Sequence, residues 1–147
     1  MELILRQKEI LLMEDNPIDI YFLQKYLPYL ACPYHLSVVS DGEAGLAFLQ
    51  RQGSYHEAPT PDLILLDIHL PKKTGWEILR WVKATPSVAH IPVVMLAGVL
   101  SPLDEQARDR LHPSLCVEKP RTVQKLQDVL KSFEELMSQH TSPEGSL

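Results

Sequence analysis

The sequence is poor in cysteine, and it has no long hydrophobic run. Its 147 residues contain two cysteines, too few for a disulfide framework or a metal cluster, so we expect both thiols to be reduced. No apolar stretch approaches the roughly 20 residues of a membrane-spanning helix, and the first residues lack the basic start of a signal peptide. These absences predict a cytoplasmic protein with no membrane contact.

Positive charge and glycine are also scarce. The chain has 14 Lys and Arg against 19 Asp and Glu, a net charge of −5, whereas a nucleic-acid surface needs a basic face. We therefore expect no nucleic-acid partner. Only 6 glycines stand against 12 prolines, so turns here depend on the fixed φ of proline. Apolar types make up 45%, enough for a core, and the length predicts a single domain over residues 1–147.

Short apolar runs alternate with amphipathic stretches along the chain. Each run is too short for a helix and most are rich in Ile, Leu or Val, which predicts five buried strands. They are Ile10 to Met13, Leu36 to Val39, Leu63 to Leu66, Val93 to Leu96, and Leu115 to Val117. Alternation of strands and helices predicts the α/β class, with a parallel sheet covered by helices on both faces.

Helix-start signals follow the five runs. Asn before Pro, Ser before Pro, a lone Thr and two Ser/Thr-x-x-Glu boxes all predict N-terminal caps. These are Asn16 with Pro17, Ser40 with Glu43, Thr74 with Glu77, Ser101 with Pro102, and Thr122. The last helix has one apolar stripe, made of Val123, Leu126, Leu130, Phe133 and Met137. Residues 138–147 are polar, which predicts a flexible tail. The charged residues from Asp104 to Arg110 predict that the helix starting at Pro102 has a solvated face.

Charged residues follow three of the predicted strands. Glu14 and Asp15 come after the first, Asp67 after the third, and Lys119 after the fifth. Ligands bind at the carboxyl ends of parallel strands, where clustered carboxylates favour a hard cation such as Mg²⁺. Lysine suits an anion brought to that cation, so the set predicts phosphoryl chemistry with Asp67 as nucleophile. Asp67 alone would be explained as a turn residue, but four charged positions together would not.

Several motifs resemble one known family, the receiver domains of two-component response regulators. The matching segments are residues 10–17 (ILLMEDNP), 61–71 (PDLILLDIHLP), 91–96 (IPVVML) and 117–120 (VEKP). Within the family the chain looks most like the small phytochrome-associated response regulators. The resemblance covers about residues 8–137. It implies a flavodoxin-like, doubly wound (βα)5 sheet with strand order 2-1-3-4-5, which is the order typical of this family.

The resemblance also implies a role for each matching residue. Asp67 would accept a phosphoryl group from a sensor histidine kinase of the phytochrome type. Glu14, Asp15, Asp67 and the backbone carbonyl of His69 would hold Mg²⁺. Lys119 would contact the phosphoryl oxygens, and the bond from Lys119 to Pro120 would be cis. A homodimer would form through the helix starting at Pro102, the strand at 115–117 and the last helix.

Two positions depart from the family. Ala97 stands where Thr or Ser ends the fourth strand, and Cys116 replaces the aromatic residue of the usual switch. The favoured hypothesis is a stand-alone receiver that is no enzyme beyond its own phosphorylation and signals through protein contacts. An alternative is a receiver-fold scaffold that binds partners or dimerises without phosphorylation. A phosphatase of the aspartyl-phosphate type ranks last, because His69 stands where a second acid is needed.

Overall fold

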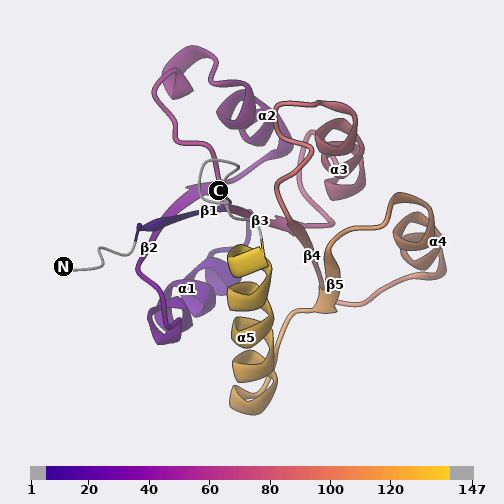
Figure 1. Cartoon of the computed structure of the whole chain (residues 1–147). Helices are drawn as coiled ribbons and strands as arrows, with labels where there is room; N and C mark the ends of the chain where they lie inside the picture. Colours follow the sequence, from indigo (N-terminus) through magenta and orange to yellow (C-terminus); the bar gives the residue numbers. More distant parts are fainter. Residues whose placement is uncertain (1–5, 140–147) are drawn as a thin grey trace.

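Residues 6–139, which the computed structural model describes, contain five parallel strands in one sheet with helices on both faces (Figure 1). The strands are β1 (Lys8–Met13), β2 (Tyr34–Val39), β3 (Leu63–Asp67), β4 (Val93–Ala97) and β5 (Leu115–Glu118). The helices are α1 (Pro17–Tyr26), α2 (Gly42–Gln50), α3 (Gly75–Ala84), α4 (Pro102–Leu111) and α5 (Val123–Gln139), with 3-10 turns η1 (Leu27–Tyr29) and η2 (Gly53–Tyr55). The strand order β2-β1-β3-β4-β5 confirms the fold and topology expected from the sequence.

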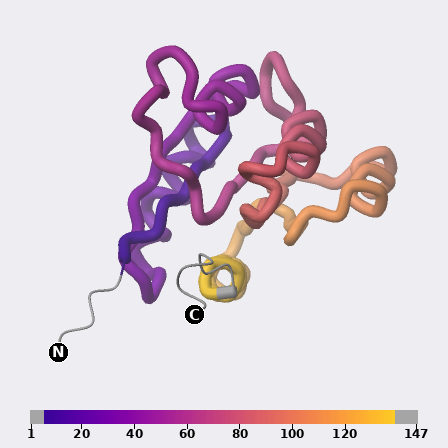
Figure 2. The backbone as a smooth tube through the Cα atoms, turned by 45° about the horizontal axis from the view of Figure 1, so that its top comes forward, coloured from indigo at the N-terminus to yellow at the C-terminus, as the bar shows by residue number. Residues whose placement is uncertain are grey.

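The sheet separates two apolar cores. Because side chains alternate along a strand, Ile10 and Leu12 of β1 pack on one side, with α1 and α5. Leu11 and Met13 pack on the other side, with α2 and α3. Figure 2 shows α5 nearly end-on, well apart from the group formed by α2, α3 and α4. This layering explains why β1 is apolar at consecutive positions rather than at every second one.

The two central strands are buried along their whole length. Every residue of β3 and β4 is buried, whereas β5 at the edge of the sheet is half-buried and ends exposed. A strand with neighbours on both edges and helices on both faces has little freedom to move. The residues at the ends of β3 and β4, Asp67 and Ala97, are therefore held rigidly.

Most helix starts agree with the predicted caps. Asn16, Thr74 and Ser101 cap α1, α3 and α4, and Thr122 Oγ1 accepts a hydrogen bond from a backbone N–H of α5. The cap predicted for α2 is wrong by one residue. Asp41, not Ser40, accepts the N–H of Ala44 at 2.7 Å, because Asp is as good a cap as Ser and α2 begins at Gly42.

The last helix buries the predicted stripe except at its first residue. Leu126, Leu130, Phe133 and Met137 are at most 5% exposed, but Val123 is 58% exposed because it precedes the part of α5 that packs on the sheet. The tail prediction is wrong for residues 138–139, which continue α5, and its remainder, 140–147, lies outside the described residues. Among residues 6–139, no helix has the length and apolar character needed to span a membrane.

Candidate functional site

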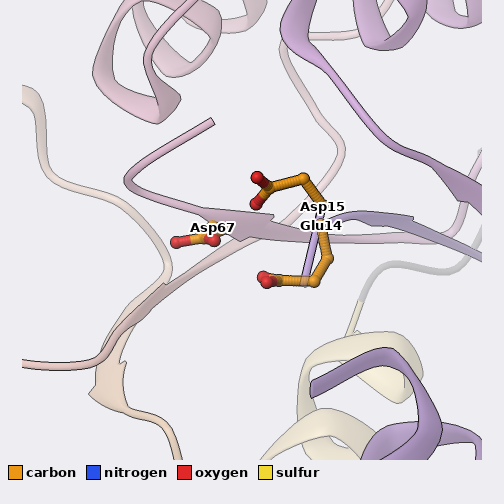
Figure 3. A group of neighbouring side chains, drawn as sticks. All are labelled: Glu14, Asp15 and Asp67. Carbon is orange, nitrogen blue, oxygen red and sulfur yellow. The ribbon is translucent and has the colours of Figure 1, made fainter. Parts of the chain in front are cut away.

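Two strand ends bring three carboxylates together. β1 pairs with β3 so that Met13 lies beside Leu66, and the chain then continues into Glu14 and Asp15 on one strand and Asp67 on the other. Figure 3 shows the three side chains turned toward one another. One carboxylate oxygen from each lies within 4.8 Å of the others. Glu14 is fully buried and Asp67 is 4% exposed, whereas Asp15 is exposed, so the cluster has one open side.

Lys119 reaches the same cluster from beyond β5. Its backbone N–H donates to the carbonyl of Ala97 at 2.6 Å, which fastens the chain to the end of β4. Its Nζ lies 3.2 Å from Glu14 Oε1 and 3.3 Å from Asp67 Oδ2. The ammonium therefore stands between the buried carboxylates of Glu14 and Asp67, and its expected contact with phosphoryl oxygens stays a prediction.

A third acid, Asp19, contacts Lys119 and was missed by the sequence reasoning. Asp19 Oδ2 lies 2.6 Å from Lys119 Nζ, the shortest of the three carboxylate contacts. Asp19 stands three residues after the cap Asn16, in the first turn of α1. An acid in a first helical turn is expected from the helix dipole alone, so its position gave no reason to connect it with a lysine 100 residues away.

The close contacts in the cluster shift the pKa values of Glu14 and Lys119. Burial, followed by the neighbouring Asp67, raises the pKa of Glu14 from 4.5 to about 8, although Lys119 acts in the opposite direction. Burial lowers the pKa of Lys119, but the hydrogen bond to Asp19 and the charges of Asp67 and Glu14 outweigh it and raise that pKa above its ordinary value. Lys119 is therefore a permanent cation here.

The donor set fits a hard divalent cation. Glu14 Oε1 accepts hydrogen bonds from Lys119 and from the backbone N–H of Asn16, but Glu14 Oε2 is buried and has no hydrogen-bond partner. An orphaned carboxylate oxygen among other carboxylates is costly unless a cation approaches it. Mg²⁺ and Mn²⁺ take such oxygens together with water, so Glu14, Asp15 and Asp67 are suitable ligands.

The structure places His69 in the loop after β3, beside Asp67. Its backbone N–H donates to Asp67 Oδ1 at 3.0 Å, which orients the carboxylate. Its side chain is 70% exposed, with Nε2 3.9 Å from Asp104 Oδ2. The expected use of the His69 carbonyl as a metal ligand stays a prediction.

One prediction next to the site is wrong. None of the peptide bonds among the described residues is cis, so the bond from Lys119 to Pro120 is trans. A trans bond is favoured before proline by about 0.5–1 kcal/mol. With this bond trans, Lys119 contacts Glu14 and Asp67.

The two departures from the usual switch are both integrated into the sheet. Ala97 ends β4, is fully buried and offers no hydroxyl toward the cluster. Cys116 lies in β5 beside Met95, half-buried, and burial raises the pKa of its thiol, so it is no reactive thiolate.

Asp104 is buried rather than solvated, which corrects the prediction for its helix face. It is 6% exposed, and its Oδ1 accepts the indole N–H of Trp76 at 3.0 Å. Its Oδ2 accepts the backbone N–H of Ser101, while Ser101 Oγ accepts the N–H of Asp104. Burial raises the pKa of Asp104, but these hydrogen bonds outweigh it and lower the pKa below its usual value. The contact ties α3 to the start of α4, near the end of β4.

The fold and the clustered acids together define a receiver domain. The chain belongs to the response regulator receiver domain family, which matches residues 10–131.

Among its relatives, the chain is similar to the response regulator Rcp1 of Synechocystis sp., with 39% identity over 127 residues, 86% of each chain. It is also similar to the crystal structure of the phosphorylated cyanobacterial phytochrome response regulator RcpA, with a TM-score of 0.83 and 37% identity over 94% of this chain and 99% of that one. The Mn²⁺-bound form of Rcp1 has a TM-score of 0.78 and 38% identity, covering 87% of this chain and 92% of that one. The chain is thus a receiver-domain response regulator related to the phytochrome response regulators.

Proposed function

We propose that the protein accepts a phosphoryl group on Asp67 from a sensor histidine kinase. The observation that carries this proposal is the meeting of Glu14, Asp15, Asp67 and the Lys119 ammonium at one edge of the sheet. A carboxylate oxygen of Asp67 attacks the phosphorus and forms a new P–O bond. The bond from phosphorus to the donor breaks at the same time, and the donor leaves with that electron pair.

Mg²⁺ belongs to the same proposal. Glu14, Asp15 and Asp67 would hold it, together with the His69 carbonyl if the resemblance extends that far, and the Mn²⁺-bound form of Rcp1 supports a divalent ion. When bound, the ion neutralises charge on the phosphoryl oxygens. Lys119 donates to one of those oxygens, and the N–H of His69 holds the Asp67 carboxylate in its orientation.

A phytochrome-type kinase is the partner that the relatives favour. Rcp1 and RcpA are similar over most of this chain, and RcpA is a cyanobacterial phytochrome response regulator. The proposal places the protein in the cytoplasm, where a kinase has ATP. It also limits the chemistry to the protein's own carboxylate, so the chain is not an enzyme for a separate substrate.

The phosphorylated protein would signal through protein contacts, including a homodimer formed by α4, β5 and α5. Two observations support this surface. Leu103 at the start of α4 is 75% exposed, and β5 is an edge strand with half-buried apolar residues. Exposed apolar residues next to an edge strand are suited to an interface. Sedimentation at micromolar concentration tests this, and a Leu103→Lys variant should weaken any dimer.

Intact-mass measurement with acetyl phosphate and Mg²⁺ tests the proposal. The wild type should gain one phosphoryl group as an acid-stable, base-labile adduct, and Asp67→Asn should gain none. Glu57→Gln is the matched control, because that side chain is 89% exposed, lies outside the site and the proposed dimer surface, and should leave the adduct unchanged. An adduct on Asp67→Asn, or none on the wild type, contradicts the proposal.

A second candidate function is an interaction scaffold that binds a kinase or dimerises without phosphorylation. The residues that favour it are Ala97 and Cys116, because the hydroxyl and the aromatic ring that normally report phosphorylation are absent at those positions. Light scattering and kinase capture before and after phosphorylation distinguish the two functions. A large change in either measurement contradicts the scaffold.

A further inference from the structure

The Lys119 ammonium has no free hydrogen-bond donor in this structure. An ammonium offers three N–H groups, and three carboxylates surround this one. Glu14 Oε1 lies at 3.2 Å, Asp67 Oδ2 at 3.3 Å and Asp19 Oδ2 at 2.6 Å. Because charge-assisted hydrogen bonds strengthen as they shorten, Asp19 is the strongest single partner of Lys119.

Asp19 comes from a different part of the fold than the other two partners. Glu14 and Asp67 lie at strand ends, whereas Asp19 lies in the first turn of α1, which Asn16 caps. The Asp19 side chain is 30% exposed, so its position is less constrained than that of the buried Glu14. It holds the ammonium from the α1 side of the cluster.

A small cavity adjoins this contact. It has a volume of about 120 Å³ between α1 and α5, and Asp19, Lys119 and Glu14 lie on its wall beside apolar residues such as Phe22 and Phe133. The tip of Lys119 is therefore not locked by close packing on that side. Its position is decided by competition among charged partners.

We propose that Asp19 is a positioning residue that holds Lys119 in the resting protein and competes with the phosphoryl group for its ammonium. The inference rests on the proposed phosphorylation of Asp67. A phosphoryl oxygen on Asp67 needs one of the three N–H groups, and all three are engaged in the resting state. Asp19 is more exposed than the buried Glu14 and Asp67, so it is the partner that gives way.

Two effects with opposite signs follow from removal of the Asp19 charge. In the wild type, the contact between Asp19 and Lys119 must break before the ammonium can donate to the phosphoryl group during transfer. Without the Asp19 charge this contact is already weakened, so the maximal phosphorylation rate at saturating Mg²⁺ should rise. The Lys119 charge is then less neutralised beside Glu14 and Asp67, so Mg²⁺ should bind more weakly. A residue that only supports the fold would not improve one property while weakening the other.

Asp19→Asn, with nearly the same shape, makes the test. With acetyl phosphate at saturating Mg²⁺, we expect its maximal rate to be about threefold to tenfold above the wild type, less than the full effect of a charge-assisted hydrogen bond because the Asp19 side chain is partly exposed. Calorimetric titration with Mg²⁺ alone should give a dissociation constant raised by about threefold to tenfold. Asp19→Glu, which restores the charge, should return both values toward those of the wild type.

Glu57→Gln is the control, since it removes a carboxylate charge from a side chain that is 89% exposed and lies outside the site and outside α4, β5 and α5. A maximal rate for Asp19→Asn that equals or falls below that of this control overturns the competition. An unchanged Mg²⁺ affinity overturns the positioning of Lys119 by Asp19. If the wild type accepts no phosphoryl group, the proposed function fails and the competition fails with it. If the wild type is phosphorylated normally but the Asp19 variants behave like the control, this inference fails and the proposed function stands.

Discussion

Glu14 should make the metal-free protein less stable as the pH rises. Its side chain is fully buried, and its Oε2 has no hydrogen-bond partner. The pKa of Glu14 is about 8 in the folded protein, raised mainly by burial, against 4.5 for an ordinary glutamate. The folded state therefore keeps this proton over a pH range in which the unfolded chain has released it.

The sign of the effect follows from proton linkage. Between about pH 4.5 and pH 8 the folded state binds more protons at Glu14 than the unfolded state, so stability falls as the pH rises. One pKa unit corresponds to about 1.4 kcal/mol, which sets an upper limit of about 5 kcal/mol for this group. Relaxation around the charge reduces the effect, and we expect a loss of about 2 kcal/mol.

Urea unfolding in EDTA, followed by tryptophan fluorescence from pH 5 to pH 8, measures this loss. Glu14→Gln removes the titrating proton while keeping the shape, so its stability should be nearly independent of pH and should exceed that of the wild type at pH 8. Glu57→Gln is the matched control, because the Glu57 side chain is 89% exposed and should keep the wild-type slope.

Added Mg²⁺ supplies an independent check on the same reasoning. The ion should stabilise the wild type more at pH 8 than at pH 5, because it binds the ionised carboxylate. A Glu14→Gln variant with the same pH slope as the wild type in EDTA would refute the argument. So would a metal-free wild type whose stability rises over this range.

Three further predictions concern the framework of the site. A Cβ on Gly75 would lie 2.5 Å from the backbone carbonyl oxygen of Asp67, so Gly75→Ala should cost about 1–3 kcal/mol of stability in urea and, under the proposed function, slow phosphorylation by acetyl phosphate. Trp76→Phe leaves the buried Asp104 without its indole donor and should cost about 1–3 kcal/mol in urea, whereas the change should cost clearly less in an Asp104→Ala background, which has no acceptor for the indole N–H. Leu126→Ala should cost about 2–5 kcal/mol and Val123→Ala less than about 0.5 kcal/mol, since only Leu126 is buried; equal losses in thermal unfolding would contradict this view of α5.

Much of the fold could be predicted because its signals are local. Five apolar runs marked the strands, and Asn16, Thr74 and Ser101 marked three helix starts through contacts with the next few residues. Errors arose where two local choices have similar energy. Asp41 replaced Ser40 as a cap for this reason, and the pattern alone did not distinguish the exposed Val123 from the buried positions of its stripe.

The site could be predicted in part for the same reason. Parallel strands place their carboxyl ends at one edge of the sheet. The sequence alone therefore predicted that four charged residues lie close together, namely Glu14, Asp15, Asp67 and Lys119. Asp19 could not, because its contact with Lys119 depends on how α1 lies against the end of β5.

By itself, the sequence determined the alternation of strands and helices and the chemistry at the strand ends, since both follow from hydrophobic period and residue type. Only the tertiary structure decided which partner holds Lys119 most closely and that Asp104 is buried against Trp76. Each of these depends on distances between elements far apart in the chain. Such distances are set by the packing of helices on the sheet, which no local pattern encodes.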